Sequence, residues 1–262
     1  MTRGEFFKLQ WVSLRALSLH SFRGLLREKI LYNLFFIAIF LLIMGYFAAL
    51  LVWGRQDRVV LHFGTLVNAL AVFGVAIGAS TRALRQELED RTIYPVLVRP
   101  VHRSVIYFSK WIGVGVFSMV YTALLASLLA LSMMIVGGKP GLAFVQSMGL
   151  IWVESTLAGS FALFLAMFLR PGLAGMSTLA YLFLGHNHEQ MMFLLKKDSA
   201  TPGLLEGLIQ LTPDLSVLLM DTRVFYEQPM SLSELFLRAG YGFGWAFMFV
   251  LFGNAVFFRK NL

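Results

Sequence analysis

Long runs of apolar residues without charges recur along the chain and dominate its pattern. A helix needs about 20 mostly apolar residues to cross the roughly 30 Å hydrocarbon core of a bilayer. Six runs are near or above that length, and they predict transmembrane helices near residues 30–54, 59–81, 106–138, 140–169, 171–188 and 236–258. The run 140–169 is too short for two spans and counts once. We therefore expect an all-α membrane protein with six transmembrane helices in a single domain covering residues 1–262.

The basic residues fall mainly on one side of these six spans. They gather in the first 29 residues and between the second and third spans, and Arg170, Arg259 and Lys260 lie on the same side. Because cytoplasmic loops carry an excess of Lys and Arg, both termini are predicted to be cytoplasmic. Removing the fifth span would leave an excess on the same side, so charge alone does not decide whether that span crosses.

Residues 1–29 have the pattern of an amphipathic helix that leads into the first span. On a helical wheel the basic side chains share an arc of about 120°, and apolar side chains including Trp11 cluster on the other side. Such a helix is expected to lie in the headgroup plane of the inner leaflet. The alternative is an ordinary basic cytoplasmic tail. The residues assigned to membrane-surface contact are Lys8, Trp11, Arg15, Phe22, Arg23 and Arg27.

The segment 186–238 is the longest stretch between spans and is predicted to be external. Thr201-Pro202 and Thr212-Pro213 each place a helix N-cap before a proline at the first helical position. Ser231 followed by Glu234 forms a capping box at the start of the sixth span. We expect short helices here, such as 204–211 and 215–220, that lie at the outer membrane surface or dip partly into it, and a periplasmic partner could bind to this segment.

Composition agrees with a membrane protein and removes other classes. Hydrophobic residues make up 58% of the chain and charged residues 14%, against about 25% charged in soluble domains. The absence of cysteine excludes a disulfide scaffold and thiolate metal sites. The net charge of +8 is explained by orientation and anionic lipid headgroups, and no basic stripe with interleaved aromatics predicts nucleic-acid binding. The motifs Gly74-x-x-x-Gly78 and Gly240-x-x-x-Gly244 permit close helix packing.

The loop between the second and third spans mixes acidic, basic and apolar residues over 86–103, with Pro95 and Pro100 inside it. A short amphipathic helix of this kind has no core of its own and should dock on another surface. A solvated loop whose charges only enforce topology explains the pattern equally well. Physical reasoning alone leaves both interpretations open.

This loop resembles the coupling segment of the permeases of type-2 ABC exporters. The resemblance is carried by Glu87-x-x-Asp90-Arg91-Thr92-Ile93-x-x-x-Leu97-x-Arg99-Pro100-Val101-x-Arg103, followed by Lys110. It extends to the six spans, to Leu211-Thr-Pro-Asp-Leu215 in the long external segment, and to Phe257-Phe-Arg-Lys260. Within the family, the chain is most similar to permeases associated with multicopper-enzyme maturation, such as those serving nitrous-oxide reductase.

The resemblance implies a membrane subunit that pairs with a second copy or a paralogue and binds two cytoplasmic ATPase subunits. Those ATPases would hold the ATP and Mg, and this chain would need no cofactor. It also implies the plasma membrane of a prokaryote, which is the inner membrane in a Gram-negative cell. The residues assigned to ATPase coupling are Glu87, Asp90, Arg91, Thr92, Ile93, Leu97, Arg99, Pro100 and Arg103.

The sequence lacks the motif that would let this chain hydrolyse ATP itself. A P-loop needs G-x-x-x-x-G-K-[ST] to cradle phosphates, and the one Gly-Lys pair, Gly138-Lys139, is followed by Pro140. The predicted spans contain no Gly-x-Ser-Gly, Glu-Glu or His-Glu-x-x-His motif, so the sequence does not indicate an intramembrane hydrolase. We expect a transport subunit that is not an enzyme, with no catalytic residues.

Glu154 is the only acid deep inside a predicted span. A carboxylate at bilayer depth costs several kcal/mol unless it is protonated or paired, so such residues usually face a bundle interior or a wet cavity. The functional interpretation is that Glu154 lines the translocation path. The alternative is a structural hydrogen bond between helices.

His186 and His188 lie near Met191 and Met192 at the outer end of the fifth span, and these ligand types suit copper. Two histidines one residue apart do not share a helix face, however, and polar residues at a span end need no further reason. We expect no metal site here.

Two transport hypotheses remain. The leading one is a non-enzymatic exporter permease that works by alternating access, driven by ATP hydrolysis in a separate subunit. The alternative is a self-sufficient proton- or ion-coupled carrier that uses Glu154. The alternative predicts transport without an ATPase.

Overall fold

The computed structural model describes residues 3–52, 54–83, 102–197, 212–219 and 228–259. Within these ranges every regular element is helical, as the sequence predicts. The elements are α1 (Arg3–Leu25), α2 (Lys29–Leu50), α3 (Gln56–Ala83), α6 (Arg103–Ile135), α7 (Leu142–Leu165), α8 (Pro171–His186), α9 (His188–Lys197), the 3-10 helix η1 (Leu215–Leu218) and α12 (Leu232–Arg259).

Five of the described helices are long and apolar enough to cross a membrane, namely α2, α3, α6, α7 and α12. They coincide with five of the six predicted spans. The remaining predicted span corresponds to α8, which has 16 residues. At about 1.5 Å per residue, α8 is roughly 24 Å long, which is shorter than the hydrocarbon core. A sixth crossing therefore stays a prediction.

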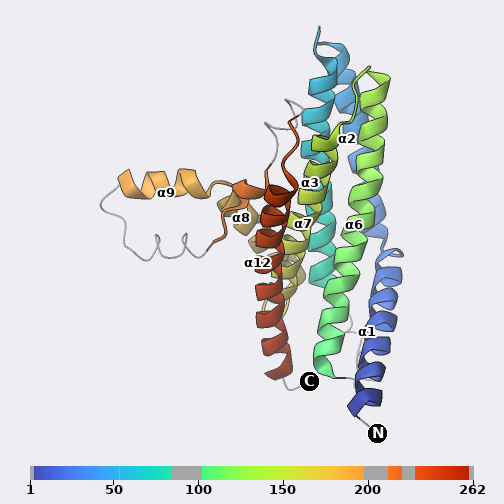
Figure 1. The fold of residues 1–262 in the computed structure, drawn as a ribbon, viewed down its shortest axis with the longest axis vertical. Helices are drawn as coiled ribbons and strands as arrows, with labels where there is room; N and C mark the ends of the chain where they lie inside the picture. Colours follow the sequence, from blue (N-terminus) through green and yellow to red (C-terminus); the bar gives the residue numbers. More distant parts are fainter. Residues whose placement is uncertain (1–2, 53, 84–101, 198–211, 220–227, 260–262) are drawn as a thin grey trace.

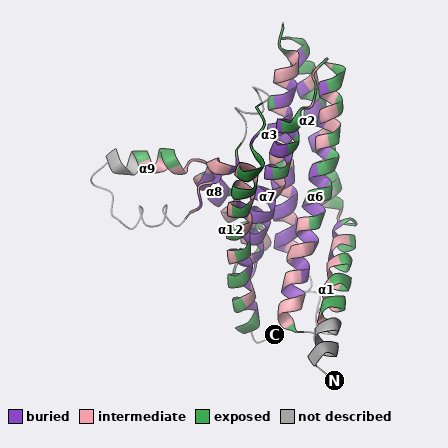
Figure 2. Ribbon diagram, in the orientation of Figure 1, coloured by how far each residue is buried: buried purple, intermediate pink, exposed green. Residues whose placement is uncertain are grey.

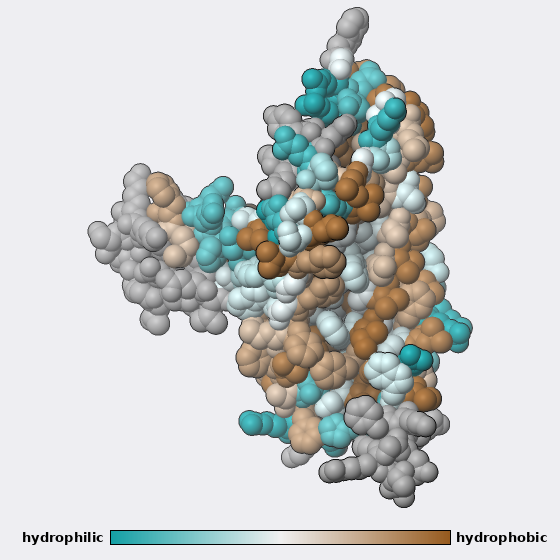
Figure 3. Space-filling model, viewed as in Figure 1, coloured by the Kyte–Doolittle hydropathy of each residue, from teal (hydrophilic) through white to brown (hydrophobic). Residues whose placement is uncertain are grey.

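The long helices run side by side along the molecule, and both chain termini lie at one end of it (Figure 1). We call this the terminal end and the opposite one the far end. Helix α7 contacts α3, α6, α8 and α12. Figure 2 shows buried residues concentrated where these helices meet, and exposed residues along the outer sides of α2, α6 and α12. The space-filling view shows hydrophobic side chains along the length of the bundle and hydrophilic ones near its far end (Figure 3).

Indole hydrogen bonds join α6 to α7 across their interface. Trp111 Nε1 donates to Ser160 Oγ at 2.8 Å, and Trp152 Nε1 donates to the carbonyl oxygen of Gly115 at 2.9 Å. Burying a large aromatic side chain contributes apolar contact area, and the bonded N–H avoids the cost of an unsatisfied donor. These bonds fix the register of α6 on α7.

Close backbone approach in this bundle depends on a glycine outside the two predicted motifs. A Cβ on Gly159 would lie 3.0 Å from Ser80 Oγ, so α3 and α7 meet here with no room for a side chain. By contrast, a Cβ on Gly78, Gly240 or Gly244 would have no atom within 4 Å. The predicted motifs therefore do not make the tight contacts between helices of this chain.

Helix α1 lies along the first part of α6. The backbone N–H of His102 donates to Gln10 Oε1 at 3.2 Å, and a Cβ on Gly113 would lie 2.7 Å from Ser21 Cβ. Both helices advance 11 residues between these contacts, 10 to 21 and 102 to 113, so they run side by side in the same direction. The predicted helix is present. It runs alongside α6, whereas we expected it to lie flat in the headgroup plane of the inner leaflet.

The two faces of α1 also differ from the prediction, which placed Trp11 on the side opposite the basic residues. Phe22 packs edge-to-face on Phe117 with ring centroids 6.0 Å apart, so Phe22 faces α6, although it was assigned to membrane-surface contact. Trp11 is 54% exposed, and the guanidinium carbon of Arg15 lies 5.2 Å from the centre of its ring. The exposed face therefore combines aromatic and basic side chains. Arg15, Arg23 and Arg27 are exposed, and the side chain of Lys8 lies outside the described residues.

From the end of α7 to the start of α12, the chain must return to the end of the bundle at which α7 begins. Gln146, in the first turns of α7, donates from Nε2 to the carbonyl oxygen of Met230 at 3.0 Å and accepts from Met230 N–H at 2.8 Å. Because Met230 precedes α12, helices α7 and α12 start at the same end, and the connection between them must run back. Helix α8 forms the first part of that return.

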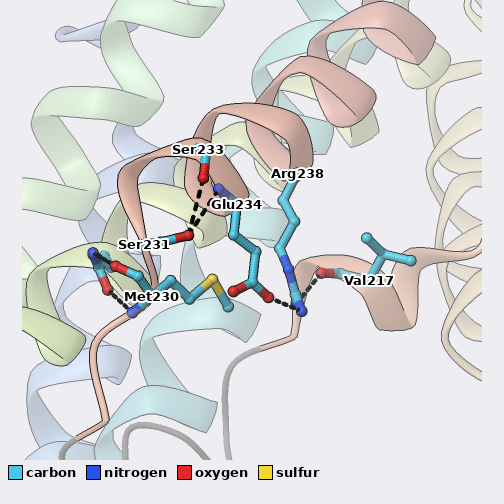
Figure 4. Close-up of polar contacts among 7 residues, drawn as sticks. Val217, Met230, Ser231, Ser233, Glu234 and Arg238 are labelled. Atoms are coloured by element: carbon cyan, nitrogen blue, oxygen red, sulfur yellow. Dashed lines mark hydrogen bonds and ion pairs between the residues drawn. The ribbon is translucent and has the colours of Figure 1, made fainter.

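Figure 4 shows how α12 begins. Ser231 Oγ accepts from the backbone N–H of Glu234 at 3.3 Å, which is one half of the predicted capping box. The Glu234 carboxylate lies 2.8 Å from Arg238 Nη2, and Arg238 Nη1 donates to the carbonyl oxygen of Val217 at 2.6 Å. The first turns of α12 therefore hold η1 in place.

The segment 186–238 differs from the prediction at two places. Helix α9 forms over residues for which the sequence predicted no particular helix, and Figure 1 shows it projecting sideways from the bundle. The predicted helix start at Thr212-Pro213 is wrong, because Asp214 caps η1 by accepting from Ser216 N–H at 3.0 Å. The predicted Thr201-Pro202 start and the helix over 204–211 lie outside the described residues.

Candidate functional site

The buried acid of the bundle lies in the middle of α7. Glu154 is 2% exposed and follows twelve residues of α7 that begin at the far end. Ser155 and Thr156, its neighbours in sequence, turn to other directions and donate to the carbonyl oxygen of Trp152.

The partner of this acid is a histidine at the last residue of α8. His186 Nε2 lies 3.1 Å from Glu154 Oε1. His186 is 24% exposed at its side chain, whereas the Glu154 side chain is 3% exposed. The end of α8 is therefore level with the middle of α7.

The other ring nitrogen of His186 faces a backbone carbonyl of its own helix. Nδ1 lies 2.9 Å from the carbonyl oxygen of Leu182, one turn earlier in α8. A carbonyl oxygen can only accept, so Nδ1 carries a hydrogen. This bond holds the ring with Nε2 directed toward the Glu154 carboxyl group.

The pair lies on the wall of a cavity of about 420 Å³ between α3, α7, α8 and η1. From α3 the wall includes His62 and Thr65, and from α7 it includes Ser147 besides Glu154. The rest of the wall is apolar and consists of Leu66, Ala69, Leu70, Phe73, Ile151, Leu179, Leu182, Phe183, Leu218 and Leu219. The site therefore combines an apolar chamber with one acid and two imidazoles.

Helix η1 closes one side of this cavity at the level of the pair. A Cβ on Gly242 in α12 would lie 2.5 Å from Val153 Cγ1 and 3.4 Å from Leu218 Cδ1. Leu218 thus reaches the middle of α7, next to Glu154. The sequence predicted that such pieces lie at the surface or dip partly into the membrane, and η1 packs deep between α7, α8 and α12.

The cavity is open at the side of the molecule between α3 and α8. Leu66, Leu70 and Phe183 line it and are 53%, 60% and 63% exposed. A second chain or lipid would have to cover this opening in a membrane.

Most residues assigned to ATPase coupling lie outside the described residues, which resume at His102. Arg103 is the first residue of α6, and His102 caps that helix by accepting from Ser104 N–H at 3.4 Å. The His102 ring stacks on Phe258, with centroids 5.8 Å apart. His102, near the end of the segment assigned to ATPase coupling, is thus fixed between α1 and α12 at the terminal end.

The structure separates the two histidines that were considered as copper ligands. Both ring nitrogens of His186 have neighbours, as above, and His188 Nδ1 lies 3.4 Å from Thr212 Oγ1. Among the described residues, no three His, Cys, Asp or Glu side chains come together in a way that could hold a metal ion.

His62 and the role of His186 as an acid partner were missed from the sequence. Helix α8 is antiparallel to α7 and follows it closely, so a histidine near its end could meet a mid-helix acid. The signal that could have indicated this is the short length of the fifth apolar run.

The fold and site together define a polytopic helical membrane protein with a buried acid on a lateral cavity. The family model described as ABC-2 family transporter protein matches residues 22–182, more than half of the chain. The chain therefore belongs to the ABC-2 transporter family. No curated protein matches it.

Membership establishes the class of function. The chain is a multi-pass membrane permease subunit of an ABC transporter, and the matched domain is a transport subunit and not an ATPase domain. ABC-2 permeases work with ABC ATPase subunits, and in such systems a separate ATPase handles the ATP. The match does not support the narrower resemblance to copper-enzyme maturation permeases.

Proposed function

We propose that this chain is the permease of an exporter in which two copies, or one copy and a paralogue, bind two cytoplasmic ATPase subunits. The substrate path runs along the lateral cavity beside Glu154. The observation that carries this proposal is the Glu154–His186 pair on a cavity between helices of a family member. Packing alone does not require an acid and a base in that position, because replacing a buried ion pair by apolar residues of similar size often leaves protein stability unchanged.

The open side of the cavity supports a path formed between two chains. Exposed leucines and a phenylalanine line the opening, and a second permease facing it would enclose the chamber. Closing and opening that interface would expose the chamber to each side of the membrane in turn. Alternating access of this kind needs two arrangements of packed helices, which ATP binding and hydrolysis would favour in turn.

Segment 87–103 is the proposed docking site for the ATPase. It ends at Arg103, the first residue of α6, and α6 packs against α1, α3 and α7. A movement of the segment would therefore act on helices that touch the cavity. Its basic residues support placement in the cytoplasm of a prokaryote with both termini inside. The narrower resemblance to maturation permeases stays a prediction about the cargo.

Purification of the tagged chain from its native host in mild detergent tests the proposal. We expect mass spectrometry to find ABC ATPase subunits in amounts equal to the total permease, counting this chain and any paralogue together, because the complex contains two permeases and two ATPase subunits. Recovery of the permease alone under conditions that preserve membrane complexes would contradict it. Transport of protons or ions by that lone chain, lost in Glu154→Gln, would favour the carrier hypothesis.

A sixth crossing through α8 is also proposed, and the absence of cysteine makes it simple to test. Single cysteines replace Lys139, Arg170 and Glu189 in separate variants, and intact cells receive a membrane-impermeant maleimide. We expect labelling at 139 and 189 and none at 170. Labelling at 139 alone would show that α8 does not bring the chain to the outer side.

A further inference from the structure

A second cavity lies at the far end of the bundle, where the connection from α2 to α3 meets the connection from α6 to α7 (Figure 1). Its volume is about 250 Å³. The described residues that line it are all different from those that line the cavity beside Glu154. They are Gly54, Arg55, Asp57, Arg58, Leu61, Met133, Gly138, Lys139, Gly141, Ala143 and Phe144.

Packing between the two connections forms the floor of this far-end cavity. A Cβ on Gly138 would lie 3.2 Å from Asp57 Cβ, so the two connections touch there. The backbone N–H of Gly138 donates to the carbonyl oxygen of Met133 at 2.9 Å, which holds the second connection on the end of α6. The buried lining residues are all apolar, namely Leu61, Met133, Ala143 and Phe144. The cavity is therefore a recess in the packed bundle.

Basic side chains from both connections line the far-end cavity. Arg55 precedes α3, Arg58 lies in the first turn of α3, and Lys139 lies between α6 and α7. Asp57 is the one acid among the described lining residues, so these residues carry two more positive charges than negative ones. Arg58 already interacts within the chain. The side chains of Arg55 and Lys139 are exposed and form no hydrogen bond or ion pair with the residues that the structure describes.

Helix α7 begins at the same cavity and adds to its positive field. Gly141 precedes the first residue of α7 and has no side chain that could cap the helix. The first N–H groups of a helix lack partners within it and carry a partial positive charge. Because Gly141 and Ala143 both line the cavity, this end of α7 and the basic side chains favour the same kind of ligand, an anion.

Exposed apolar side chains lie directly beside the basic ones. Leu51 follows α2, Ile135 ends α6 and Leu142 begins α7, and all three are exposed. Each lies within four residues of Arg55 or Lys139 in the sequence. Lys and Arg at the end of an apolar helix surface lie at the level of lipid headgroups. The anionic group available at that level is phosphate.

We propose that the far-end cavity binds a phosphate group, the chemistry that a phospholipid headgroup and free phosphate share. The planar guanidinium of Arg55 can bond two phosphate oxygens at once, and the Lys139 ammonium acts as a compact charge beside them. Because one of these cations belongs to each connection, the bound phosphate joins the start of α3 to the connection between α6 and α7. The site is separate from the proposed substrate path.

The test uses the full chain in lipid nanodiscs with Gly141→Cys as a reporter, since the natural sequence contains no cysteine. A Cβ at Gly141 would have no atom within 4 Å, so the reporter fits on the cavity wall. The measurement is the rate at which N-ethylmaleimide alkylates the reporter, because an occupied cavity slows it. The reference is phosphatidylcholine, whose phosphate is paired with its own ammonium group. One arm adds increasing phosphatidylglycerol, and the other adds inorganic phosphate in place of chloride at equal ionic strength.

We expect alkylation to slow as the share of phosphatidylglycerol or the concentration of phosphate rises. Each Lys or Arg near an anionic surface strengthens binding by about fivefold. Arg55→Gln with Lys139→Gln should therefore need roughly 25 times more of the protecting anion for the same effect, and each single variant about five times more. The single variants keep the test decisive if the double variant does not fold.

Two further double variants serve as controls. Arg55→Lys with Lys139→Arg keeps both charges and should keep the protection. Lys29→Gln with Arg170→Gln removes two exposed charges away from the cavity and should keep it as well. Protection by phosphatidylglycerol alone supports a lipid headgroup as the ligand, and equal protection by inorganic phosphate supports the free anion. The proposal is overturned if neither slows alkylation, if the Arg55 and Lys139 variants are protected as the natural chain is, or if the Lys29 and Arg170 control loses protection equally.

Discussion

Replacing Asp90 and Arg91 together with alanine is expected to remove at least nine-tenths of the ATPase that copurifies with this permease. The change deletes one acid and one base from the segment that resembles the family's coupling segment. Removing one partner of a buried, hydrogen-bonded charge pair at an interface costs about 2–5 kcal/mol, and a tenfold loss of affinity needs only about 1.4 kcal/mol. The measurement is the ratio of ATPase to permease by quantitative mass spectrometry.

The matched control for this experiment is the double variant Glu234→Ala with Arg238→Ala. It also removes one acid and one base, but these pair with each other at the first turns of α12, whereas Arg103 follows His102, which lies beside the last turn of α12. The control should retain its ATPase. If both variants lose the ATPase equally, the loss reflects a damaged permease. If neither variant loses the ATPase, segment 87–103 is not the docking site.

The second large effect is expected on stability, from Gly253→Ala in α12. A Cβ at Gly253 would overlap the Tyr107 hydroxyl and lie 2.6 Å from Tyr107 Cζ. Tyr107 is fully buried and its ring packs on Phe257, so it has little room to move. Overpacking of this kind typically costs about 1–3 kcal/mol, although alanine is the better helix former. Thermal unfolding in detergent should show a clear fall in Tm.

Gly240→Ala is the comparison for that variant, since it makes the same chemical change in the same helix. A Cβ at Gly240 would have no atom within 4 Å, so only helix propensity acts, and it favours alanine by up to about 1 kcal/mol. The two substitutions should shift Tm in opposite directions. A fall in Tm of similar size for both would show that the Tyr107 contact does not govern the effect.

The apolar runs predicted the helices well because burial in a membrane demands long segments without charge. The second run, 59–81, corresponds to α3 and the third, 106–138, to α6, each displaced by only a few residues. Helix ends are set by polar residues and caps, such as His102 before α6, which a hydrophobicity pattern does not contain. Helix α9 was not predicted either, because its apolar run is only five residues long.

The site was only half predicted. Glu154 was found because an acid inside an apolar run is conspicuous. Its partner His186 was assigned to the outer surface, because a span of the expected length would have carried it there, and the shorter α8 leaves it level with Glu154. Trp11 was predicted to lie on the apolar side of α1 at the membrane surface, and helical periodicity does not reveal that α1 packs on α6 or which face meets it. Contacts between helices depend on tilt and depth, and a single sequence encodes these only indirectly.

Helix α6 contains 33 residues and is therefore about 50 Å long, well beyond the thickness of the hydrocarbon core. Helix α6 is about 20 Å longer than the hydrocarbon core is thick, and α1 packs against its first turns at the terminal end. A rod of this length works as a lever arm. If it pivots by about 5° near one end, the other end moves by roughly 4 Å, which is nearly one helical turn. A small push on the start of α6 could therefore shift its distant end far enough to repack the bundle.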